Sequence, residues 1–209
     1  TEIYTLSLHD ALPICWVSPD SGSPLGMVFD KQANDVRECV HGALKQWFGD
    51  GHLHERESVW QLTYGKVPYT FFTTLGVLHT PAHEKQVPGS IWNAPREAVV
   101  GFLQGLFSAD GTVGSNEAEK SCSVRLASSS KPLLEDVQRL LVNFGIVSKI
   151  HHRRSTGYRR LPDGQGGYKD YLVHDDYELI LDKANRDRYV EIIGFIDGAK
   201  QAKVTRFIT

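Results

Sequence analysis

The sequence has few cysteines, no long apolar run and no net positive charge, and each absence excludes a class of protein. Its three cysteines, Cys15, Cys39 and Cys122, are isolated and odd in number, so neither a disulfide framework nor a cysteine-rich metal site is expected. They are interpreted as small buried thiols in a reducing cytoplasm. No run of about eighteen apolar residues occurs, so neither a transmembrane segment nor a membrane partner is predicted. The net charge of −2 means that any DNA-binding role must rest on local charge.

The first residues differ in character from the rest. Residues 1–14 read TEIYTLSLHDALPI, and the stretch from Leu8 to Ile14 resembles the translation of a sequencing-adapter oligonucleotide. Residues 1–15 are therefore interpreted as a non-native segment and are left out of the fold prediction. A short amphipathic arm or an unusual strand is the alternative.

Two helices predict an internal duplication. Apolar residues recur at helical spacing over 34–48 and over 132–144, and glycine follows each helix at once. The glycines Gly49 and Gly145 are 96 positions apart (145 − 49 = 96). The same offset relates further pairs of similar residues: Asn34 and Ser130 as helix starts, Leu44 and Leu140, Val28 and Val124, and Val17 and Val113. Matches at helix start, helix face and flanking strands indicate a repeated unit.

Each helix is followed by two strand-like runs and a short helix. The strands are expected at 52–57 and 58–64 in the first unit and at 147–154 and 172–181 in the second, and the short helices at 68–75 and 184–193. Gly76 and Gly194 end the short helices and are 118 positions apart (194 − 76 = 118). The second unit therefore contains about 22 extra residues (118 − 96), which fall within 153–170.

The segment from Arg96 to Gly111, REAVVGFLQGLFSADG, predicts a helix with a chemical role at its end. Gly101 and Gly105 lie one turn apart and cost about 1 kcal/mol each relative to alanine, which indicates that another backbone packs closely there. Ala109 continues this stripe of small residues. Asp110 falls at the helix C-terminus, where the helix dipole disfavours an anion and a bound cation would offset the cost. An Asp-Gly turn that only ends a buried helix is the alternative.

Residues 103–111, LQGLFSADG, resemble the signature nonapeptide of LAGLIDADG homing endonucleases, especially those carried by inteins. The resemblance covers 16–203 and implies an α+β fold of two αββαββα repeats whose strands form a saddle for DNA. It implies a first half at 16–88 without its motif helix, and a second half at 89–209 with its motif helix at 95–110. It further implies a monomer with pseudo-symmetric halves, a double-stranded DNA target, and Mg²⁺ or another divalent cation bound by Asp110 for phosphodiester hydrolysis.

Two Lys-Gln pairs strengthen the resemblance. Lys85, in the stretch AHEKQVP, and Lys200, which follows Ile193-Gly194-Phe195, match family blocks in which a lysine lies near the scissile phosphates. An ammonium group there can stabilise the charge that develops during phosphoryl transfer. Asp110, Lys85 and Lys200 are therefore the predicted catalytic residues. Lys203 is a rival for Lys200, and a solvated surface charge is the alternative for either lysine.

The extra segment of the second unit carries the local positive charge. Basic residues and tyrosines surround a glycine-rich turn at 163–167, and a basic hairpin of this kind can follow DNA phosphates and enter a major groove. A solvated, flexible loop is the alternative. The predicted DNA-binding residues are Arg125, His151, Arg153, Arg154, Tyr158, Arg159, Arg160 and Lys169. The histidine pairs 52/54 and 79/83 lack a third ligand, so zinc is not predicted.

The repeat predicts that one acid is missing. The position equivalent to Asp110 in the first unit is 14 (110 − 96 = 14), and the sequence has Ile14 there. Because paired acids hold the cations for hydrolysis, the full-length parent is expected to cleave DNA with Mg²⁺ and this chain to be weak or inactive. No residues for protein splicing are found, so the chain is not expected to splice by itself, although its parent is expected to be an intein. The alternative is a non-cleaving DNA- or RNA-binding protein of the same fold, a regulator or a maturase.

Overall fold

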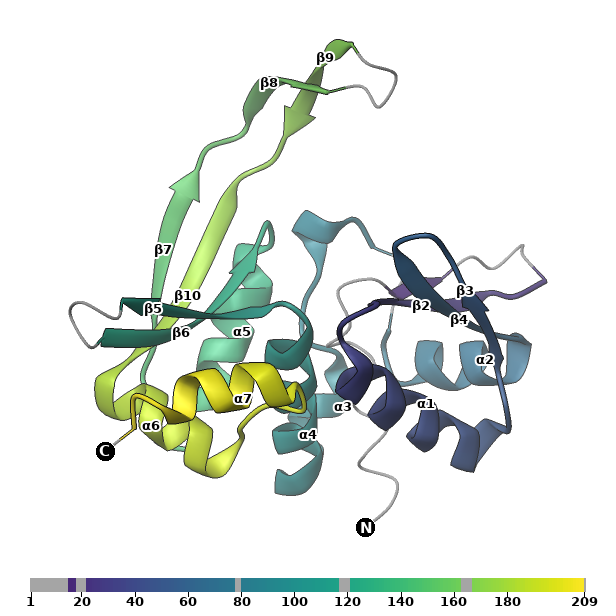
Figure 1. Cartoon of the computed structure of the whole chain (residues 1–209), viewed down its shortest axis with the longest axis horizontal. Coiled ribbons are helices and arrows are strands. Elements are labelled where there is room, and N and C mark those ends of the chain that lie inside the picture. The colour runs from purple at the N-terminus through teal and green to yellow at the C-terminus, as the bar shows by residue number, and fades with distance from the viewer. Residues whose placement is uncertain (1–14, 18–21, 78–79, 117–120, 163–166, 209) are drawn as a thin grey trace.

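The structure, a computed structural model of the chain, describes residues 15–17, 22–77, 80–116, 121–162 and 167–208. Residues 1–14, interpreted above as non-native, lie outside this part. Two α+β halves lie side by side (Figure 1). The first half comprises β1 (Cys15–Val17), β2 (Leu25–Asp30), α1 (Asn34–Phe48), β3 (His52–Glu55), β4 (Val59–Tyr64) and α2 (Lys66–Thr74). The predicted strands and helices are present, with ends shifted by at most two residues.

A connector and a second half follow. The connector contains the 3₁₀ turn η2 (Ala82–Glu84) and α3 (Gly89–Trp92). The second half begins with the motif helix α4 (Arg96–Ala109) and continues with β5 (Gly111–Asn116), β6 (Ser121–Ser128), α5 (Lys131–Val142), β7 (Lys149–Arg154), β8 (Gly157–Pro162), β9 (Tyr168–Val173), β10 (Asp176–Asp182), α6 (Lys183–Ile192) and α7 (Gly198–Thr205). In the described ranges, no helix is long and apolar enough to span a bilayer.

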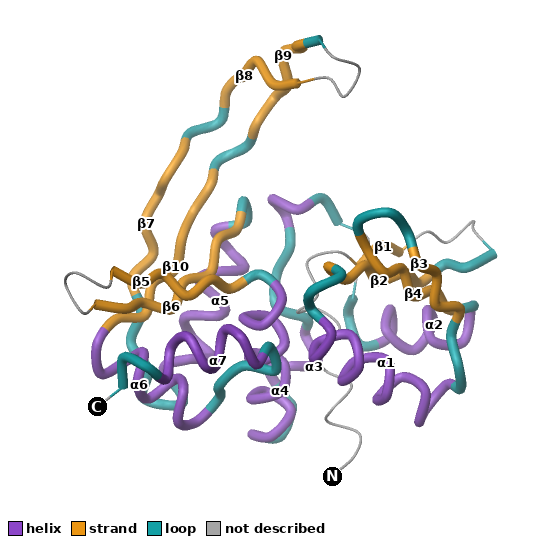
Figure 2. Tube along the Cα trace, in the orientation of Figure 1, coloured by secondary structure: helices purple, strands orange, loops and turns teal. Residues whose placement is uncertain are grey.

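The two halves have the same sheet topology. The strand orders are β1-β2-β4-β3 and β5-β6-β10-β7, and all pairs are antiparallel. Figure 2 shows the helices on one side of both sheets, with the strands on the other side. Each half has its own cluster of buried apolar residues, and α4 contributes Phe102, Leu103, Leu106 and Phe107 to the larger, second cluster. The predicted duplication therefore extends from sequence to topology.

Equivalent rows of the two sheets can be matched residue by residue. One row runs Cys15, Met27, Leu62, Leu53 and the other Gly111, Leu126, Leu179, Ile150. The two central residues of each row are at most 1% exposed. Each row also lies at the same distance from the next helix. Gly65, the cap of α2, comes three residues after Leu62, and Asp182, the cap of α6, comes three residues after Leu179. Gly111 is thus equivalent to Cys15. The residue before Cys15, at position 14, is therefore the counterpart of Asp110, and it lies outside the described residues.

Two details of the predicted repeat are wrong. The rows make Leu25, not Val28, the counterpart of Val124, because Val28 lies on the opposite face of its strand and is partly exposed. Asn34 is the first helical residue rather than a cap, and its predecessor Ala33 makes no side-chain capping bond. In the second half the Ser130 hydroxyl does cap its helix by accepting the N–H of Leu133 at 3.2 Å.

Four glycines mark the repeat through their backbone conformation. Gly49, Gly76, Gly145 and Gly194 have φ of 77°, 98°, 69° and 68° and are the glycines with positive φ among the described residues. Side chains rarely tolerate this conformation. Gly49 pairs with Gly145 and Gly76 with Gly194, at the offsets of 96 and 118 that the sequence predicted. Equivalent helices of the two halves therefore end with the same backbone conformation.

The extra residues of the second half form a separate two-stranded sheet, β8-β9. Strand β7 pairs with β10, and β8 pairs with β9 further along the same ribbon, which rises away from the body (Figure 1). Arg154 pairs with Asp176 and Gly157 with Val173, so these two pairs share one register, whereas the pairing of β7 with β10 shifts by one residue between Asp176 and Tyr177. The strand predicted at 172–181 is interrupted at His174 and Asp175, where Thr156 and Asp175 exchange two hydrogen bonds of 3.0 Å.

Candidate active site

The end of α4 places Asp110 between the two halves. Asp110 follows the last residue of the helix, and its N–H donates to the carbonyl of Leu106 at 2.9 Å. At Gly111 a Cβ would lie 2.3 Å from the Phe107 carbonyl oxygen, so only glycine fits after the aspartate. Ala109 packs against the apolar cluster of the first half. The Asp-Gly pair is therefore fixed by close backbone packing, and the carboxylate is held where the halves meet.

The predicted catalytic residues are close enough to interact electrostatically. Burial raises the pKa of Asp110 to about 6, and the ammonium groups of Lys85 and Lys200 lower it but do not cancel the effect of burial. Burial removes water that would solvate the carboxylate. Asp110 is thus a carboxylate whose charge is only partly compensated by its neighbours, which is the electrostatic condition that favours cation binding.

Lys200 and Lys203 are held by backbone carbonyls. The Lys200 ammonium donates to the carbonyl of Ser108 at 2.5 Å and lies 3.5 Å from that of Ala109. Lys203 donates to the carbonyl of Val113 at 2.7 Å. The carbonyls at a helix C-terminus have no partners within the helix, and a cation there also opposes the dipole. Lys200 therefore caps α4, a role that the sequence prediction did not include.

Lys85 is held differently. Its backbone carbonyl accepts the Ser130 hydroxyl at 2.6 Å, which fixes the connector against the start of α5. Its ammonium makes no hydrogen bond within the described part of the chain, although it acts on the charge of Asp110. Of the two predicted catalytic lysines, Lys85 is the one with an uncommitted ammonium group.

Two polar residues of α4 organise the loop before α7. Gln104 donates to the carbonyl of Ile193 at 3.0 Å. The Ser108 hydroxyl donates to the Gln104 carbonyl at 2.6 Å and accepts the N–H of Ile196 at 2.7 Å. The polar role of neither residue was predicted from the sequence; its signal is a polar pair four positions apart on a helix that is apolar after its first turn. The small residues Gly101 and Gly105 lie on the same helix, partly and fully buried.

The predicted DNA-binding residues form two groups. At the base of the ribbon, Arg153 and Arg125 converge on the buried Glu178, at 2.9 and 3.5 Å from its two carboxylate oxygens, and His151 is the direct strand partner of Glu178. The sequence analysis missed Glu178. It neutralises part of the local positive charge and fixes the direction of both guanidinium groups.

The second group extends along the ribbon. Arg154 ends β7, and Tyr158, Arg159 and Arg160 lie on β8, with Lys169 on β9; all are exposed. Strand pairing places Arg159 and Lys169 on one face together with Tyr171. Arg160 lies on the other face, 6.0 Å above the ring of Tyr168 and beside Asp170. One face is therefore more basic than the other. Contact of these residues with DNA stays a prediction.

Asp110 has no ready-made set of metal ligands around it. No group of three or more His, Cys, Asp or Glu side chains that could hold an ion occurs among the described residues. His52 and His54 stack on each other; His79 lies outside the described residues, and His83 instead stacks on His174, with ring centroids 4.0 Å apart.

Comparison with known families decides the assignment. Residues 97–194 match the family described as LAGLIDADG-like domain. The chain contains a LAGLIDADG domain. The matched segment includes α4, Asp110 and the basic ribbon, and the α+β fold predicted from the LAGLIDADG resemblance is confirmed by this match and by the structural similarity given next.

Segments similar to this chain occur within larger proteins. The chain is 35% identical over 109 residues to the ribonucleoside-diphosphate reductase NrdEB subunit alpha of Bacillus subtilis, covering 52% of this chain and 10% of that protein. It is 36% identical over 191 residues to the DNA polymerase II large subunit of Thermococcus kodakarensis, covering 88% of this chain and 10% of that protein. The chain thus spans about a tenth of the length of these curated relatives.

Solved structures of a homing endonuclease share the fold. A structure from work on mesophilic variants of I-DmoI matches 92% of this chain and 94% of its own, with a TM-score of 0.58 and 17% identity. I-DmoI in complex with DNA and Mn matches with a TM-score of 0.55 and 18% identity, covering 92% of this chain and 95% of its own.

Proposed function

We propose that this chain is the endonuclease region of an intein-associated homing endonuclease, which binds a double-stranded DNA site and hydrolyses its phosphodiester bonds with a divalent cation. The observation that carries the proposal is the partly compensated carboxylate of Asp110, with the ammonium of Lys85, which makes no hydrogen bond to any described residue, in range of its charge. A carboxylate that binds a divalent cation, together with an ammonium group in range, is suited to hold and polarise a phosphate.

The residues of the chain have distinct roles in this proposal. Asp110 is the residue that would hold Mg²⁺ or a related ion, and such an ion supplies charge neutralisation and an activated water. Magnesium commonly binds with one or two carboxylates, water and substrate phosphates, so the single acid fits part of a site. Lys85 stabilises the charge on the phosphate, and Lys200 holds the helix end that presents Asp110. The complex of I-DmoI with Mn supports a divalent cation.

DNA is proposed to lie on the strand side of the two sheets, opposite the helices. The basic ribbon rises from that side (Figure 1), and I-DmoI, which shares the fold, has been solved with DNA. A non-cleaving DNA- or RNA-binding role remains the second candidate, favoured by the absence of an acid at position 14, where the sequence has Ile14.

Insertion into host proteins is supported by the relatives. The matched region makes up about a tenth of a reductase subunit and about a tenth of a DNA polymerase subunit. These enzymes catalyse different reactions, and a segment that recurs in both is what a mobile inserted element would leave. This pattern supports the proposed intein parent.

A graft tests the nuclease proposal. Residues 1–14 correspond to 97–110 by the repeat offset, so a chain whose first fourteen residues are replaced by a copy of 97–110 regains both acids. A target would first be selected from a random duplex library by binding. With Mg²⁺, the grafted chain is expected to cut both strands and the unaltered chain to cut weakly or not at all.

Matched controls separate the outcomes. A graft that ends in asparagine instead of aspartate should bind the same DNA without cutting it. Robust cleavage by the unaltered chain that Asp110→Ala abolishes would refute the idea that this chain is impaired. Tight binding by the graft without cleavage would instead favour a regulator or maturase.

A further inference from the structure

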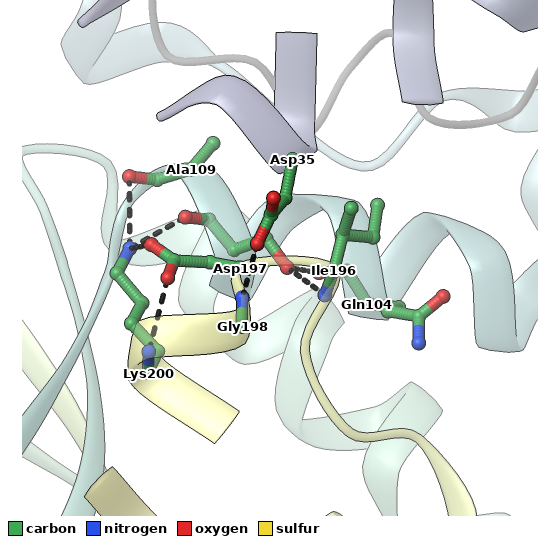
Figure 3. Close-up of polar contacts among 8 residues, drawn as sticks. Asp35, Gln104, Ala109, Ile196, Asp197, Gly198 and Lys200 are labelled. Carbon is green, nitrogen blue, oxygen red and sulfur yellow. Dashed lines mark hydrogen bonds and ion pairs between the residues drawn. The ribbon is translucent and has the colours of Figure 1, made fainter. Parts of the chain in front are cut away.

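The N-terminus of α7 is bound by an acid from the other half of the molecule. The Asp35 carboxylate, in the first turn of α1, accepts the backbone N–H of Gly198 at 3.0 Å (Figure 3). Gly198 is the first residue of α7, and a Cβ there would come within 2.8 Å of the same carboxylate oxygen. The two residues are 163 positions apart. A side chain at position 198 would require the Asp35 carboxylate to move, so the contact in its present geometry depends on glycine there.

Helix α7 already has a cap of its own. The Asp197 carboxylate accepts the N–H of Lys200 at 3.0 Å, as a helix cap does. Asp35 is therefore a second anion at a helix end whose dipole favours negative charge. The contact of Asp35 with Gly198 fixes where α7 lies relative to the first half. The Asp197 cap cannot do this, because Asp197 and Lys200 both lie at the start of α7.

A short series of bonds connects this contact to Asp110. Lys200, on the first turn of α7, donates to the carbonyl of Ser108, near the end of α4 and two residues before Asp110. Ile196, just before α7, donates its N–H to the Ser108 hydroxyl at 2.7 Å. Ile196 and Ala109 both pack against the apolar cluster of the first half. The start of α1, the start of α7 and the end of α4 therefore meet at one point (Figure 3).

We propose that Asp35 is a positioning residue for the candidate active site: by holding Gly198 it fixes α7, so that Lys200 caps the end of α4 and sets the place of Asp110. Asp35 is not a catalytic residue, and none of its described contacts is with Asp110. The proposal rests on the proposed function in taking Asp110 as the important acid. It adds that the first half of the chain controls the geometry of an acid that belongs to the second half.

The reactivity of the Lys200 amine with an acylating reagent measures whether α7 is held in place. The ammonium is partly buried and bonded to carbonyls, so it should react slowly with such a reagent. Acetylation would be measured by mass spectrometry on the full chain as a function of time. Asp35→Ala and Gly198→Ala, which break the same bond from opposite sides, are each expected to raise the acetylation rate of Lys200 about tenfold.

The same helix supplies an internal control. Lys203 lies on the next turn of α7 and is bonded to the Val113 carbonyl, so its rate should stay unchanged if only the start of α7 is released. Glu38→Gln removes an exposed acid of α1 whose described ion pair is with the neighbouring Arg37, and it should change neither rate. Asp35→Asn keeps the shape of the side chain and an acceptor oxygen, and should give a smaller increase at Lys200.

The outcomes are distinct. Equal increases at Lys200 and Lys203 in the Asp35 variants would mean general loosening and would overturn the proposal, as would an unchanged rate at Lys200. Mn²⁺ binding, followed by electron paramagnetic resonance, separates this result from the proposed function. If the unaltered chain and the graft bind no Mn²⁺ while Lys200 is released as expected, the metal proposal fails and the positioning role stands.

Discussion

Replacing Asp110 with asparagine is expected to stabilise the fold at neutral pH, although Asp110 is the acid proposed to hold the metal ion. Burial raises the pKa of Asp110 from its ordinary 3.8 to about 6. The folded state thus binds the proton more tightly than the unfolded state does. Below the pKa of the unfolded chain the carboxyl group is protonated in both states and does not lower the free energy of unfolding. As the pH rises from 3.8 to about 6, the free energy of unfolding falls. Asparagine resembles the protonated acid and avoids this loss.

The size of the effect follows from the pKa. A difference of about two pH units corresponds to at most about 3 kcal/mol at pH 7.5, since each unit is worth about 1.4 kcal/mol. The same relation gives about 1 kcal/mol at pH 4.5. The gain of Asp110→Asn should therefore shrink to about a third between these two values.

Urea denaturation of the Asp110→Asn variant and the unaltered chain at several pH values measures this difference. Asp50→Asn is a suitable control, because Asp50 is exposed and pairs with Lys45 at the surface; its effect should stay within about 0.5 kcal/mol. A variant that is less stable than the parent at pH 7.5, or a difference that does not change with pH, would refute the assignment of Asp110 as a partly compensated buried acid.

Three further predictions concern the ribbon and the helix ends. Arg159→Ala and Lys169→Ala should each weaken DNA binding similarly on all sequences and reduce the salt dependence by about one phosphate contact; anisotropy titrations at several salt concentrations test this, and a sequence-dependent loss would contradict it. Replacing 157–173 with a two-residue turn should leave the fold intact and shorten the footprint by about six base pairs, because six residues of strand span about 20 Å; an unchanged footprint would exclude DNA contact by the ribbon. Gly49→Ala should cost about 1 kcal/mol because φ is positive there, whereas Gly42→Ala, exposed inside α1, should stabilise by up to about 1 kcal/mol; thermal unfolding of both variants compares them, and equal signs would contradict this account.

The sequence predicted the features of the fold that depend on local patterns, namely helix ends and the repeat. Helix ends at Gly49 and Gly145 are visible because an apolar period stops at a residue that tolerates positive φ. The repeat follows from the distance between such ends. The Val28 pairing failed because a strand pattern has a period of two, and a small error in register moves a residue to the other face.

The missed features are contacts between distant segments. Glu178 lies in a strand whose neighbours are apolar, and only the folded sheet brings Arg125 and Arg153 to it. Likewise, no local pattern shows that Lys200 bonds to the end of a helix some ninety residues earlier. Motif matching placed the lysine near Asp110, but its hydrogen-bond partners required the structure.

The separate two-stranded end of the ribbon has a consequence for how its length can change. Strands β8 and β9 form a two-stranded sheet of their own beyond the ends of β7 and β10, so the ribbon can be lengthened or shortened at its tip without repacking either core. Changes that add or remove two residues on each strand keep the same side chains on the same face, whereas a change of one residue turns them over. An even change in the number of residues on each strand would therefore alter the length of the ribbon and leave the body of the protein unchanged.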